Sequence, residues 1–309
     1  MKILVTGGAG FIGSNVCDAF AAAGHEVVAL DDLSSGRREN VSRGIRLVEA
    51  SLRDGARVAA ILKEEKPQVV CHHAAQIDVR KSVSDPVFDA ELNLVAMIRL
   101  LEASVAAGVK KVLFSSSGGA CYGEQEIYPA PETHPTRPVS PYGASKAAGE
   151  LYLGYYRAQY GLPYVALRYA NVYGPRQNPH GEAGVVAIFA EKLLRGQECT
   201  IYGDGRQTRD FVFVGDVARA NLLALSSDHS GPVNVGTGVE TSVNELYERM
   251  AKIAKVGKPA RHAEGKPGEQ RRSVIDPALG ARVLGWKPEV SLDAGLASTL
   301  DFFRARSAA

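Results

Sequence analysis

The sequence predicts an α/β protein with a doubly wound parallel sheet and a smaller α/β lobe toward the C-terminus. Short apolar runs rich in β-branched residues alternate with longer segments of helical periodicity through the first half of the chain. Strands that are apolar throughout indicate a parallel sheet covered on both faces, because helices return the chain between parallel strands. Right-handed crossovers then wind the sheet outward in both directions.

The elements follow in order from these patterns. Strands are predicted over 3–6, 26–30, 45–49, 68–72, 111–115 and 164–168, with helices over 11–23, 54–65, 85–107 and 141–160. Beyond 170 the residues predict a long loop over 171–184, a helix near 186–194, two strands around a Gly-Asp-Gly turn within 200–214, a polar loop over 259–273, a short helix capped by Asp276 and a terminal helix over 292–303. We expect a first domain at 1–170 and an interleaved lobe at 171–309, with elements near 210–250 returning to the first domain.

The composition is that of an ordinary globular protein. Hydrophobic residues make up 45% of the 309 positions and charged residues 23%, which is typical of water-soluble domains. A net charge of +2 is too small to indicate a nucleic acid or a membrane as partner. The four cysteines are far apart and form no CxxC pair, so neither a disulfide framework nor a metal site is expected. The N-terminus reads as a strand and not as a signal peptide, which makes the cytoplasm the expected location.

A glycine-rich stretch, VTGGAGFIG at 5–13, joins the first predicted strand to the first predicted helix. Gly7, Gly10 and Gly13 have one spacing of the dinucleotide fingerprint, and Gly8, Gly10 and Gly13 have another. Glycines allow a tight turn and a close approach of the backbone to a pyrophosphate. The N-terminus of the following helix adds free N–H groups and a partial positive charge. This stretch therefore predicts a dinucleotide cofactor.

The end of the second predicted strand bears on which dinucleotide is bound. Asp31 stands there, where a carboxylate accepts hydrogen bonds from an adenosine ribose and repels a 2′-phosphate, so NAD is favoured. The adjacent Asp32 is a second candidate contact. Arg37 and Arg38 follow closely and keep NADP open as an alternative.

The segment SPYGASK at 140–146 is the candidate catalytic helix start. Ser140 is a good N-cap and Pro141 a good first helical residue, which places Tyr142 and Lys146 on one helical face. The strand before this helix ends in serines, and strand ends face the ligand crevice in this fold. A tyrosine is a weak base at its usual pKa near ~10. We expect the Lys146 ammonium and a nicotinamide ring to lower the pKa of Tyr142.

Several motifs together resemble those of a known family. TGGAGFIG, SSSGGACYGE, YGASK, LRYANVYGPR, GEAGVVAIF and GDGRQTRDFVFVGDVARA are similar to the motifs of extended short-chain dehydrogenases/reductases, and above all of the UDP-glucose (UDP-galactose) 4-epimerases. The resemblance covers essentially the whole chain. It implies a Rossmann domain that holds NAD and a C-terminal lobe that binds a UDP-sugar.

The resemblance implies epimerisation at C4 of a UDP-hexose, by transient oxidation and return of hydride to the opposite face. Tyr142 and Lys146 would act with Ser117, for which Ser116 is the fallback; an alignment on the following Tyr-Gly pair puts Gly118 there instead. Dehydratases and decarboxylases of this superfamily carry an acid just after the catalytic Ser or Thr. Here that acid is absent, which favours oxidation and reduction without elimination.

The resemblance also implies two sets of binding residues. The cofactor set comprises Gly7, Gly10, Phe11, Ile12, Gly13, Asp31, Asp32, Ser35, Gly36, Ser51, Leu52, His73, Ala74, Ala75, Gln76, Asn93, Ser115, Tyr142, Lys146 and Tyr169. The substrate set comprises Ser117, Tyr142, Asn171, Gly184, Val185, Thr200, Tyr202, Arg209, Lys266, Glu269 and Ser273. Lys266 and Glu269 replace an Arg and an Asp of the family pattern, a change that Arg271 or Arg272 would compensate.

The specificity and assembly of the protein are expectations of the same kind. Ser273 stands where some family members have a bulky tyrosine, so UDP-GlcNAc and UDP-GalNAc are expected as further substrates. The helices predicted over 85–107 and 141–160 have wide apolar stripes, and the family commonly forms homodimers through them. A related epimerase for UDP-glucuronate or a dTDP- or GDP-sugar, and a non-catalytic NAD-binding regulator, are the alternatives.

Overall fold

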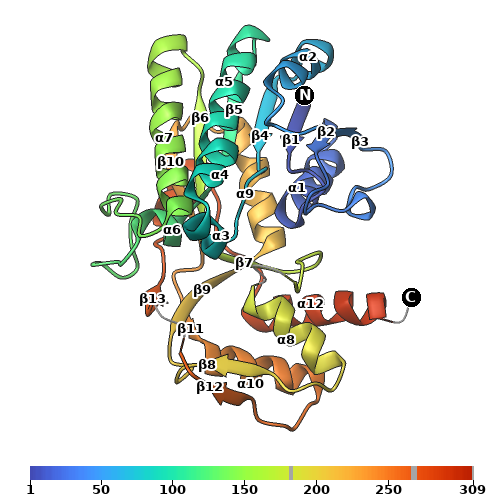
Figure 1. Ribbon diagram of the computed structural model, residues 1–309, viewed down its shortest axis with the longest axis vertical. Helices are drawn as coiled ribbons and strands as arrows, with labels where there is room; N and C mark the ends of the chain where they lie inside the picture. The colour runs from blue at the N-terminus through green and yellow to red at the C-terminus, as the bar shows by residue number, and fades with distance from the viewer. Residues whose placement is uncertain (181–183, 266–269, 308–309) are drawn as a thin grey trace.

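A seven-stranded parallel sheet dominates the computed structural model, which describes residues 1–180, 184–265 and 270–307 (Figure 1). The strand order is β10-β6-β5-β4-β1-β2-β3. These strands are β1 (Lys2–Thr6), β2 (Glu26–Asp31), β3 (Arg46–Glu49), β4 (Val69–His72), β5 (Lys111–Ser117), β6 (Tyr164–Tyr169) and β10 (Gly231–Val235). The order reverses between β1 and β4, the kind of switch point at which parallel sheets bind ligands. The predicted doubly wound fold is confirmed.

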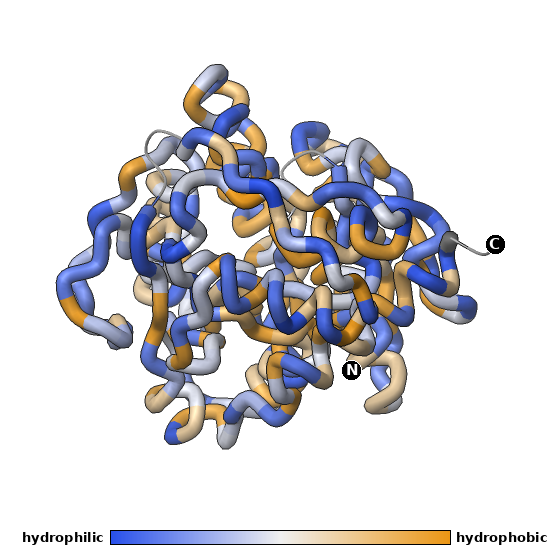
Figure 2. The backbone as a smooth tube through the Cα atoms, turned by 90° about the horizontal axis from the view of Figure 1, so that it is seen from below, coloured by the Kyte–Doolittle hydropathy of each residue, from blue (hydrophilic) through white to orange (hydrophobic). Residues whose placement is uncertain are grey.

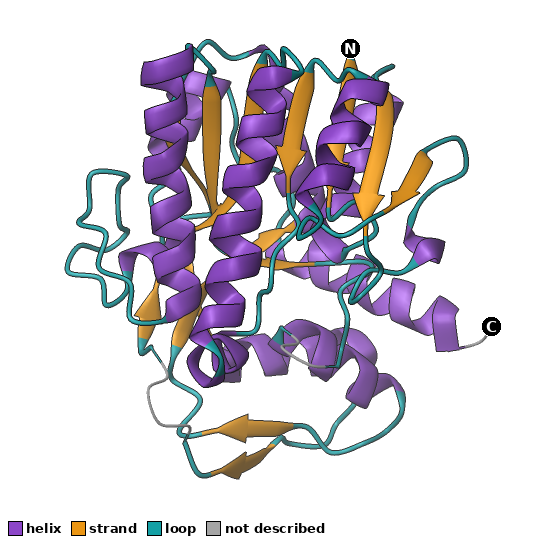
Figure 3. Cartoon of the chain, turned by 45° about the horizontal axis from the view of Figure 1, so that its top comes forward, coloured by secondary structure: helices purple, strands orange, loops and turns teal. Residues whose placement is uncertain are grey.

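Helices cover both faces of this sheet because its strands are apolar on both sides (Figure 3). Ile3 and Val5 pack in one core with α1 (Phe11–Ala22) and α9 (Val214–Ser226). Leu4, between them, packs in the other core with α2 (Gly55–Glu65), α5 (Ala96–Ala106) and α7 (Pro141–Tyr160). Hydrophobic and hydrophilic segments alternate along the helices, as expected when one helical face meets a sheet (Figure 2).

A smaller lobe lies at the carboxyl edge of the sheet, at the bottom of Figure 1. Three helices form its core: α8 (Val185–Leu194), α10 (Val243–Ala254) and α12 (Leu292–Ser307). One of its sheets joins β7 (Asn171–Tyr173), β11 (Glu240–Ser242) and β13 (Arg272–Ser273) around β9 (Thr208–Phe213). The other pairs β8 (Thr200–Tyr202) with β12 (Arg261–Ala263). Short helices fill the connections: a 3₁₀ turn (Arg38–Asn40), α3 (Val79–Ser84), α6 (Gly118–Tyr122) and α11 (Ala278–Leu284).

Three expectations for individual elements need correction. The helix predicted over 85–107 is interrupted: α4 (Pro86–Ala90) leads into a π-helical segment (Glu91–Val95) before α5 begins. The strands within 200–214 do not pair with each other, because β8 pairs with β12 and β9 with three other strands. The short helix α11 begins at Ala278, two positions after Asp276, although the Asp276 carboxylate does accept a hydrogen bond from the Ala278 N–H at 2.9 Å.

The chain returns to the first sheet after it has entered the smaller lobe. α9 packs against α1, and β10 pairs with β6 to form one edge of the seven-stranded sheet. Between residue 170 and the start of α9, the chain contributes to the smaller lobe. There β7 pairs with β9, and α8 packs in the core of that lobe. The two lobes are therefore interleaved along the sequence.

A buried ion pair connects α7 to the sheet beneath the carboxyl edge. Glu150 on α7 accepts hydrogen bonds from Arg168 on β6, with Nη2 to Oε2 at 2.6 Å and Nε to Oε1 at 2.9 Å. Both side chains are more than nine-tenths buried. Arg168 also donates to the Tyr122 hydroxyl at 3.0 Å. A buried pair of this kind makes the loss of one partner costly, because the other charge is left without compensation.

Replacement of Arg168 by Ala (Arg168→Ala) is expected to lower the free energy of unfolding by about 3–5 kcal/mol, because Glu150 would remain buried and unpaired. Chemical denaturation followed by circular dichroism measures this loss. Arg304→Ala is the control, since Arg304 is exposed and pairs with Asp301 on the surface of α12; a change of at most about 0.5 kcal/mol is expected there. Equal effects of the two substitutions would contradict the prediction.

Candidate active site

The glycine loop between β1 and α1 has the close contacts that its sequence predicts. Gly7 has a φ of +69°, and a Cβ there would lie 2.6 Å from the Ala74 amide nitrogen. A Cβ on Gly13 would lie 2.1 Å from the Gly7 carbonyl oxygen. Gly10 is the N-cap of α1 and has no side chain to cap the first turn, which begins at Phe11 and Ile12. The loop thus presents backbone N–H groups where a pyrophosphate would bind.

Asp31 ends β2 beside this loop. Its carboxylate accepts hydrogen bonds from the Ala9 N–H at 3.0 Å and the Leu33 N–H at 2.9 Å, and burial raises its pKa. A Cβ on Gly36 would lie 2.7 Å from Oδ1 of Asp31, so the chain after β2 folds closely around this carboxylate. The Asp31 carboxylate is therefore held in place at the end of β2 by the surrounding backbone.

The neighbouring charged residues have other partners. Asp32 is exposed and accepts hydrogen bonds from the N–H and hydroxyl of Ser34. Arg38 forms an ion pair with Glu49 at 2.6 Å, and Arg37 lies 3.6 Å from Glu39. Since Arg38 is held by a carboxylate, the local arrangement favours a ribose with a free 2′-hydroxyl.

The rest of the predicted cofactor set lies at the same carboxyl edge. The Gln76 N–H donates to the Asn93 side chain at 2.8 Å, and His73 Nε2 lies 3.2 Å from the Tyr169 hydroxyl. Because parallel strands end at one edge of the sheet, these residues from distant parts of the chain are brought together. Most of them lie in or just after a strand of the large sheet: Ser35 after β2, Ser51 and Leu52 after β3, His73, Ala74, Ala75 and Gln76 after β4, Ser115 in β5 and Tyr169 in β6. Asn93 lies in the π-helical segment.

The predicted helix start at α7 is confirmed in detail. Ser140 is the N-cap, and its hydroxyl accepts a hydrogen bond from the Gly143 N–H at 3.1 Å. A Cβ on Gly143 would lie 2.4 Å from the Ala120 carbonyl oxygen, so this first turn packs directly on α6. Lys146, one turn later, is buried and donates from Nζ to the Ser115 carbonyl oxygen at 2.8 Å. Its Nζ lies 5.8 Å from the centre of the Tyr142 ring.

Of the serines that end β5, the geometry favours Ser117. Ser116 is buried, and its hydroxyl donates to Glu150 at 2.6 Å, on the side of the buried ion pair. Ser117 is only partly buried and is the N-cap of α6, where its hydroxyl accepts from the Ala120 N–H at 3.4 Å. Gly118 offers no side chain, and a Cβ there would lie 2.9 Å from Ile275. The fallback to Ser116 and the alternative alignment on Gly118 are thus both disfavoured.

The ionisation of Tyr142 and Lys146 depends on burial and on nearby charges. Burial raises the pKa of the Tyr142 phenol, and the negative charge of Asp89 raises it further. Burial lowers the pKa of the Lys146 ammonium to about 8, an effect that the negative charges of Asp89 and Glu150 oppose. At both side chains burial is the largest effect on the pKa. The expected lowering of the Tyr142 pKa includes a bound nicotinamide ring and stays a prediction.

Residues of the smaller lobe reach this edge through β13. Ser273 is buried, and a Cβ on Gly119 would lie 2.9 Å from its hydroxyl oxygen. Arg209 on β9 is the register partner of Ser273, and its Nη1 donates to the Thr208 carbonyl oxygen. The other predicted substrate contacts are more dispersed: Asn171 begins β7, Gly184 and Val185 begin α8, and Thr200 and Tyr202 lie on β8 in the separate two-stranded sheet. Lys266 and Glu269 lie outside the described residues.

The two arginines that follow in the sequence are each paired with a carboxylate. Arg271 binds Asp204 through two hydrogen bonds of 2.9 and 3.0 Å. Arg272 binds Glu240 through two hydrogen bonds of 2.8 and 3.1 Å and stacks on the Tyr128 ring. Both guanidinium groups are exposed and paired with carboxylates, and their compensation for Lys266 and Glu269 stays a prediction.

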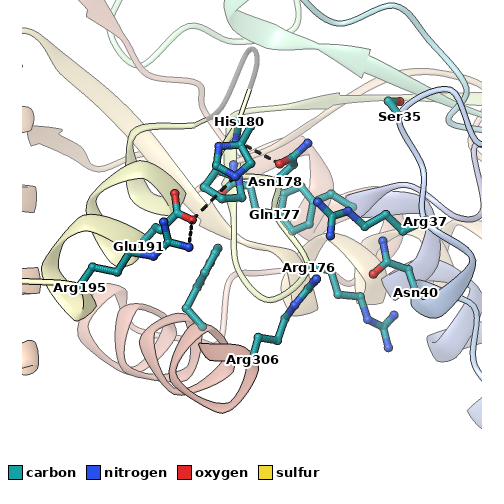
Figure 4. A pocket seen from close by; sticks show the side chains of 13 residues that line it. Ser35, Arg37, Asn40, Arg176, Gln177, Asn178, His180, Glu191, Arg195 and Arg306 are labelled. Atoms are coloured by element: carbon teal, nitrogen blue, oxygen red, sulfur yellow. Dashed lines mark hydrogen bonds and ion pairs between the residues drawn. The ribbon is translucent and has the colours of Figure 1, made fainter. Parts of the chain in front are cut away.

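A pocket of about 580 Å³ lies at the seam between the lobes, away from the catalytic candidates (Figure 4). It takes in Phe11 and Ser35 from the predicted cofactor set, together with arginines that project from both lobes. These arginines lie close to carboxylates: Arg195 to Glu191 at 3.0 Å, Arg176 to Asp18 at 2.7 Å, and Arg37 and Arg306 to Glu39 at 3.6 and 3.8 Å. The pocket therefore borders the glycine loop, and ion pairs along its wall connect the two lobes.

Sequence reasoning missed two groups of polar residues beside the site. Asp89 on α4 is fully buried and accepts hydrogen bonds from Gln76, Asn93 and Ser145. The Tyr169 hydroxyl accepts a hydrogen bond from Asn221 on α9 at 2.8 Å. The one available signal was the spacing of Asp89 and Asn93, two polar residues one turn apart in an otherwise apolar stripe.

Comparisons with known proteins agree with this geometry. The chain is 50% identical to the UDP-glucose 4-epimerase of Mycolicibacterium smegmatis over 315 residues, which cover 99% of this chain and 100% of the relative. The structure of Thermotoga maritima UDP-glucose 4-epimerase with UDP-glucose matches with a TM-score of 0.97 and 47% identity, over 99% of this chain and 100% of that one. The Thermus thermophilus UDP-glucose 4-epimerase in complex with NAD matches with a TM-score of 0.94 and 49% identity, over 98% and 99% of the two chains.

The family itself is given by a sequence model that matches residues 3–236, from the first strand of the large sheet to just beyond its last. This span contains the glycine loop, Ser117, Tyr142 and Lys146. The resemblance drawn from the motifs is confirmed: the chain belongs to the NAD-dependent epimerase/dehydratase family.

Proposed function

We propose that the protein epimerises UDP-galactose and UDP-glucose at C4, with NAD as a cofactor that is regenerated in each turnover. The observation that supports this proposal most directly is the hydrogen bond from Lys146, on the helix that also carries Tyr142, to the Ser115 carbonyl oxygen on β5, the strand that ends at Ser117. The full-length similarity to UDP-glucose 4-epimerases supports the choice of substrate.

NAD, held by the glycine loop and Asp31, would supply the hydride acceptor and donor for the sugar C4. The chain supplies the proton transfers and the positioning. Tyr142 takes the proton of the C4 hydroxyl during oxidation and returns it after the keto sugar has turned over. Lys146 places a positive charge beside Tyr142 and is itself oriented by the Ser115 carbonyl oxygen. Ser117 hydrogen-bonds the C4 oxygen, which assists each proton transfer.

The residues after Ser117 support a reaction confined to one carbon. Gly118, Gly119 and Ala120 follow it, and the next acid in the sequence is Glu124. Elimination of water or loss of a carboxyl group needs an additional acid or base at this point. The composition of this segment therefore favours epimerisation over dehydration.

We extend the proposal to UDP-GlcNAc and UDP-GalNAc. The buried Ser273 faces Gly119, so a small side chain lies opposite a residue that has none. A bulkier side chain at either position would reduce the room beside the sugar for an N-acetyl group.

The nucleotide contacts remain part of the proposal. We assign the diphosphate to Asn171 and Arg209, since an arginine fork suits phosphate oxygens. The uracil is assigned to Gly184, Val185, Thr200 and Tyr202, and the remaining nucleotide contacts to Lys266 and Glu269.

A homodimer is supported by apolar side chains exposed on helices that pack together. Val87 on α4 is 69% exposed, and Leu151 and Tyr155 on α7 are 77% and 51% exposed. α4 packs against α7, so a face shared by the two helices would be covered by a second copy.

We also propose a cytoplasmic location, since the four cysteines are all unpaired thiols, as is usual in reducing compartments. No helix of the described residues has the length and apolarity that a membrane span requires.

Tyr142→Phe is expected to reduce epimerisation by at least about 10²-fold, because the proton of the C4 hydroxyl loses its acceptor. Sugar identity followed by NMR measures the rate, and NAD released on denaturation measures cofactor content. NAD content and the circular dichroism spectrum should equal those of the unsubstituted protein. Epimerisation at the original rate would refute the assignment.

Separate incubations with UDP-galactose, UDP-GlcNAc and UDP-glucuronate test the substrate proposal. Turnover of the first two is expected without added cofactor, since the dinucleotide stays bound through the cycle. Absence of UDP-GlcNAc turnover would remove the N-acetyl extension. Turnover of UDP-glucuronate alone would favour the related epimerase, and no turnover of any sugar would favour the NAD-binding regulator.

Leu151→Glu is expected to convert a dimer into a monomer, because a charge would be buried in the proposed apolar face. Light scattering coupled to size-exclusion chromatography measures the mass. Lys252→Glu on α10 of the smaller lobe is the control and should leave the mass unchanged. A monomeric unsubstituted protein would contradict the proposal.

A further inference from the structure

The buried carboxylate of Asp89 is the strongest polar feature that the proposed reaction leaves unexplained. Asp89 lies on α4 with no exposed surface. Burying a carboxylate is costly unless its oxygens are hydrogen-bonded. Here both oxygens are used, which shows that the surrounding elements are arranged around this group.

Three segments of the chain donate to Asp89. Ser145 on α7 donates its hydroxyl to Oδ2 at 2.8 Å. Asn93 in the π-helical segment and Gln76 after β4 donate to Oδ1 at 3.0 and 3.1 Å. No cationic side chain of the described residues lies within ion-pair distance of it, so its negative charge is compensated locally by neutral donors.

These donors belong to the predicted cofactor contacts and to the catalytic helix. Gln76 and Asn93 also bind each other, with the Gln76 N–H to Asn93 Oδ1 at 2.8 Å and Asn93 Nδ2 to the Gln76 carbonyl oxygen at 2.9 Å. Ser145 stands between Tyr142 and Lys146 on α7. The π-helical segment that carries Asn93 is an irregularity of a kind often found at functional sites.

We propose that Asp89 is a positioning residue of the active site, which ties the cofactor-contacting segment to the catalytic helix and holds a negative charge beside Tyr142 and Lys146. The inference rests on the proposed function and deepens it. Its physical basis is that epimerisation needs Tyr142 to return a proton as readily as it takes one. A negative charge beside Tyr142 favours the protonated phenol, and so bears on how readily the proton is taken and returned.

Other titratable groups also face this cluster. Burial raises the pKa of Tyr142 and lowers that of Lys146, and Cys121 and Asp89 each act on both groups in the direction that raises the pKa. The lysine in turn adds to the effect of burial in lowering the pKa of His72 and His73, each to about 3, so both imidazoles are neutral at physiological pH. The groups that face Tyr142 and Lys146 are Asp89 from α4, Cys121 from α6, Glu150 from α7, and His72 and His73 from the end of β4.

The test compares Asp89→Asn with Ser145→Ala in the holoenzyme. Asp89→Asn keeps the shape and removes the charge, so the pKa values of Tyr142 and Lys146 should both fall, by roughly 0.5–1 unit. Ser145→Ala removes one hydrogen bond and keeps the charge, so these values should move by less than about 0.3 unit. Asp216→Asn controls for general instability, since Asp216 is a buried carboxylate near the start of α9, where it accepts from the Glu289 N–H.

Two measurements separate this inference from the proposed function. The ionisation of Tyr142 is followed by NMR with tyrosine ¹³C-labelled at Cζ, the signal being assigned by its loss in Tyr142→Phe. The pH profile of kcat is measured alongside, and both limbs should move to lower pH in Asp89→Asn only. A shifted Tyr142 signal in a protein without epimerase activity would refute the function and keep the role of Asp89. An unshifted signal and an unshifted profile in Asp89→Asn would overturn the inference.

Discussion

The hydrogen bond from Lys146 Nζ to the Ser115 carbonyl oxygen is the contact on which the arrangement of the site depends. It fixes the catalytic helix against the end of β5, the strand that carries Ser117. A buried ammonium group must be hydrogen-bonded, and the carbonyl at this strand end provides the acceptor. Since the same helix carries Tyr142 one turn earlier, the position of the strand determines where both side chains lie.

One turn further along the same helix, the buried pair of Glu150 and Arg168 fixes α7 to β6 as well. The helix is therefore attached to two neighbouring strands by charged groups on its inner face. Such contacts are directional, in contrast to the apolar packing of Leu153 and Tyr156 in the core nearby. Packing brings the helix to the sheet, and the charged contacts set its position along the strands.

The sequence predicted the elements with strong local signals. The six strands before residue 170 and the helix at 141–160 were foreseen because apolar runs, the Ser140 cap and Pro141 act within a few residues. The glycine loop and Asp31 were found for the same reason. The π-helical interruption around Asn93 was not, and the polar contacts beside it join segments distant in sequence. The pairing of β8 with β12 and the burial of Ser273 against Gly119 were equally out of reach, because they join residues far apart in the chain.

The late addition of β10 to the large sheet has a consequence for synthesis. Until Ser226 has left the ribosome α1 lacks its complete neighbour α9, and until Val235 has left it β6 has an open edge. The nascent chain must hold a half-covered sheet while the first part of the smaller lobe, from β7 to β9, is still being made. Exposed apolar strands of this kind are where newly made chains associate wrongly. The interleaving that builds a site from both lobes thus lengthens the period in which the growing polypeptide needs protection.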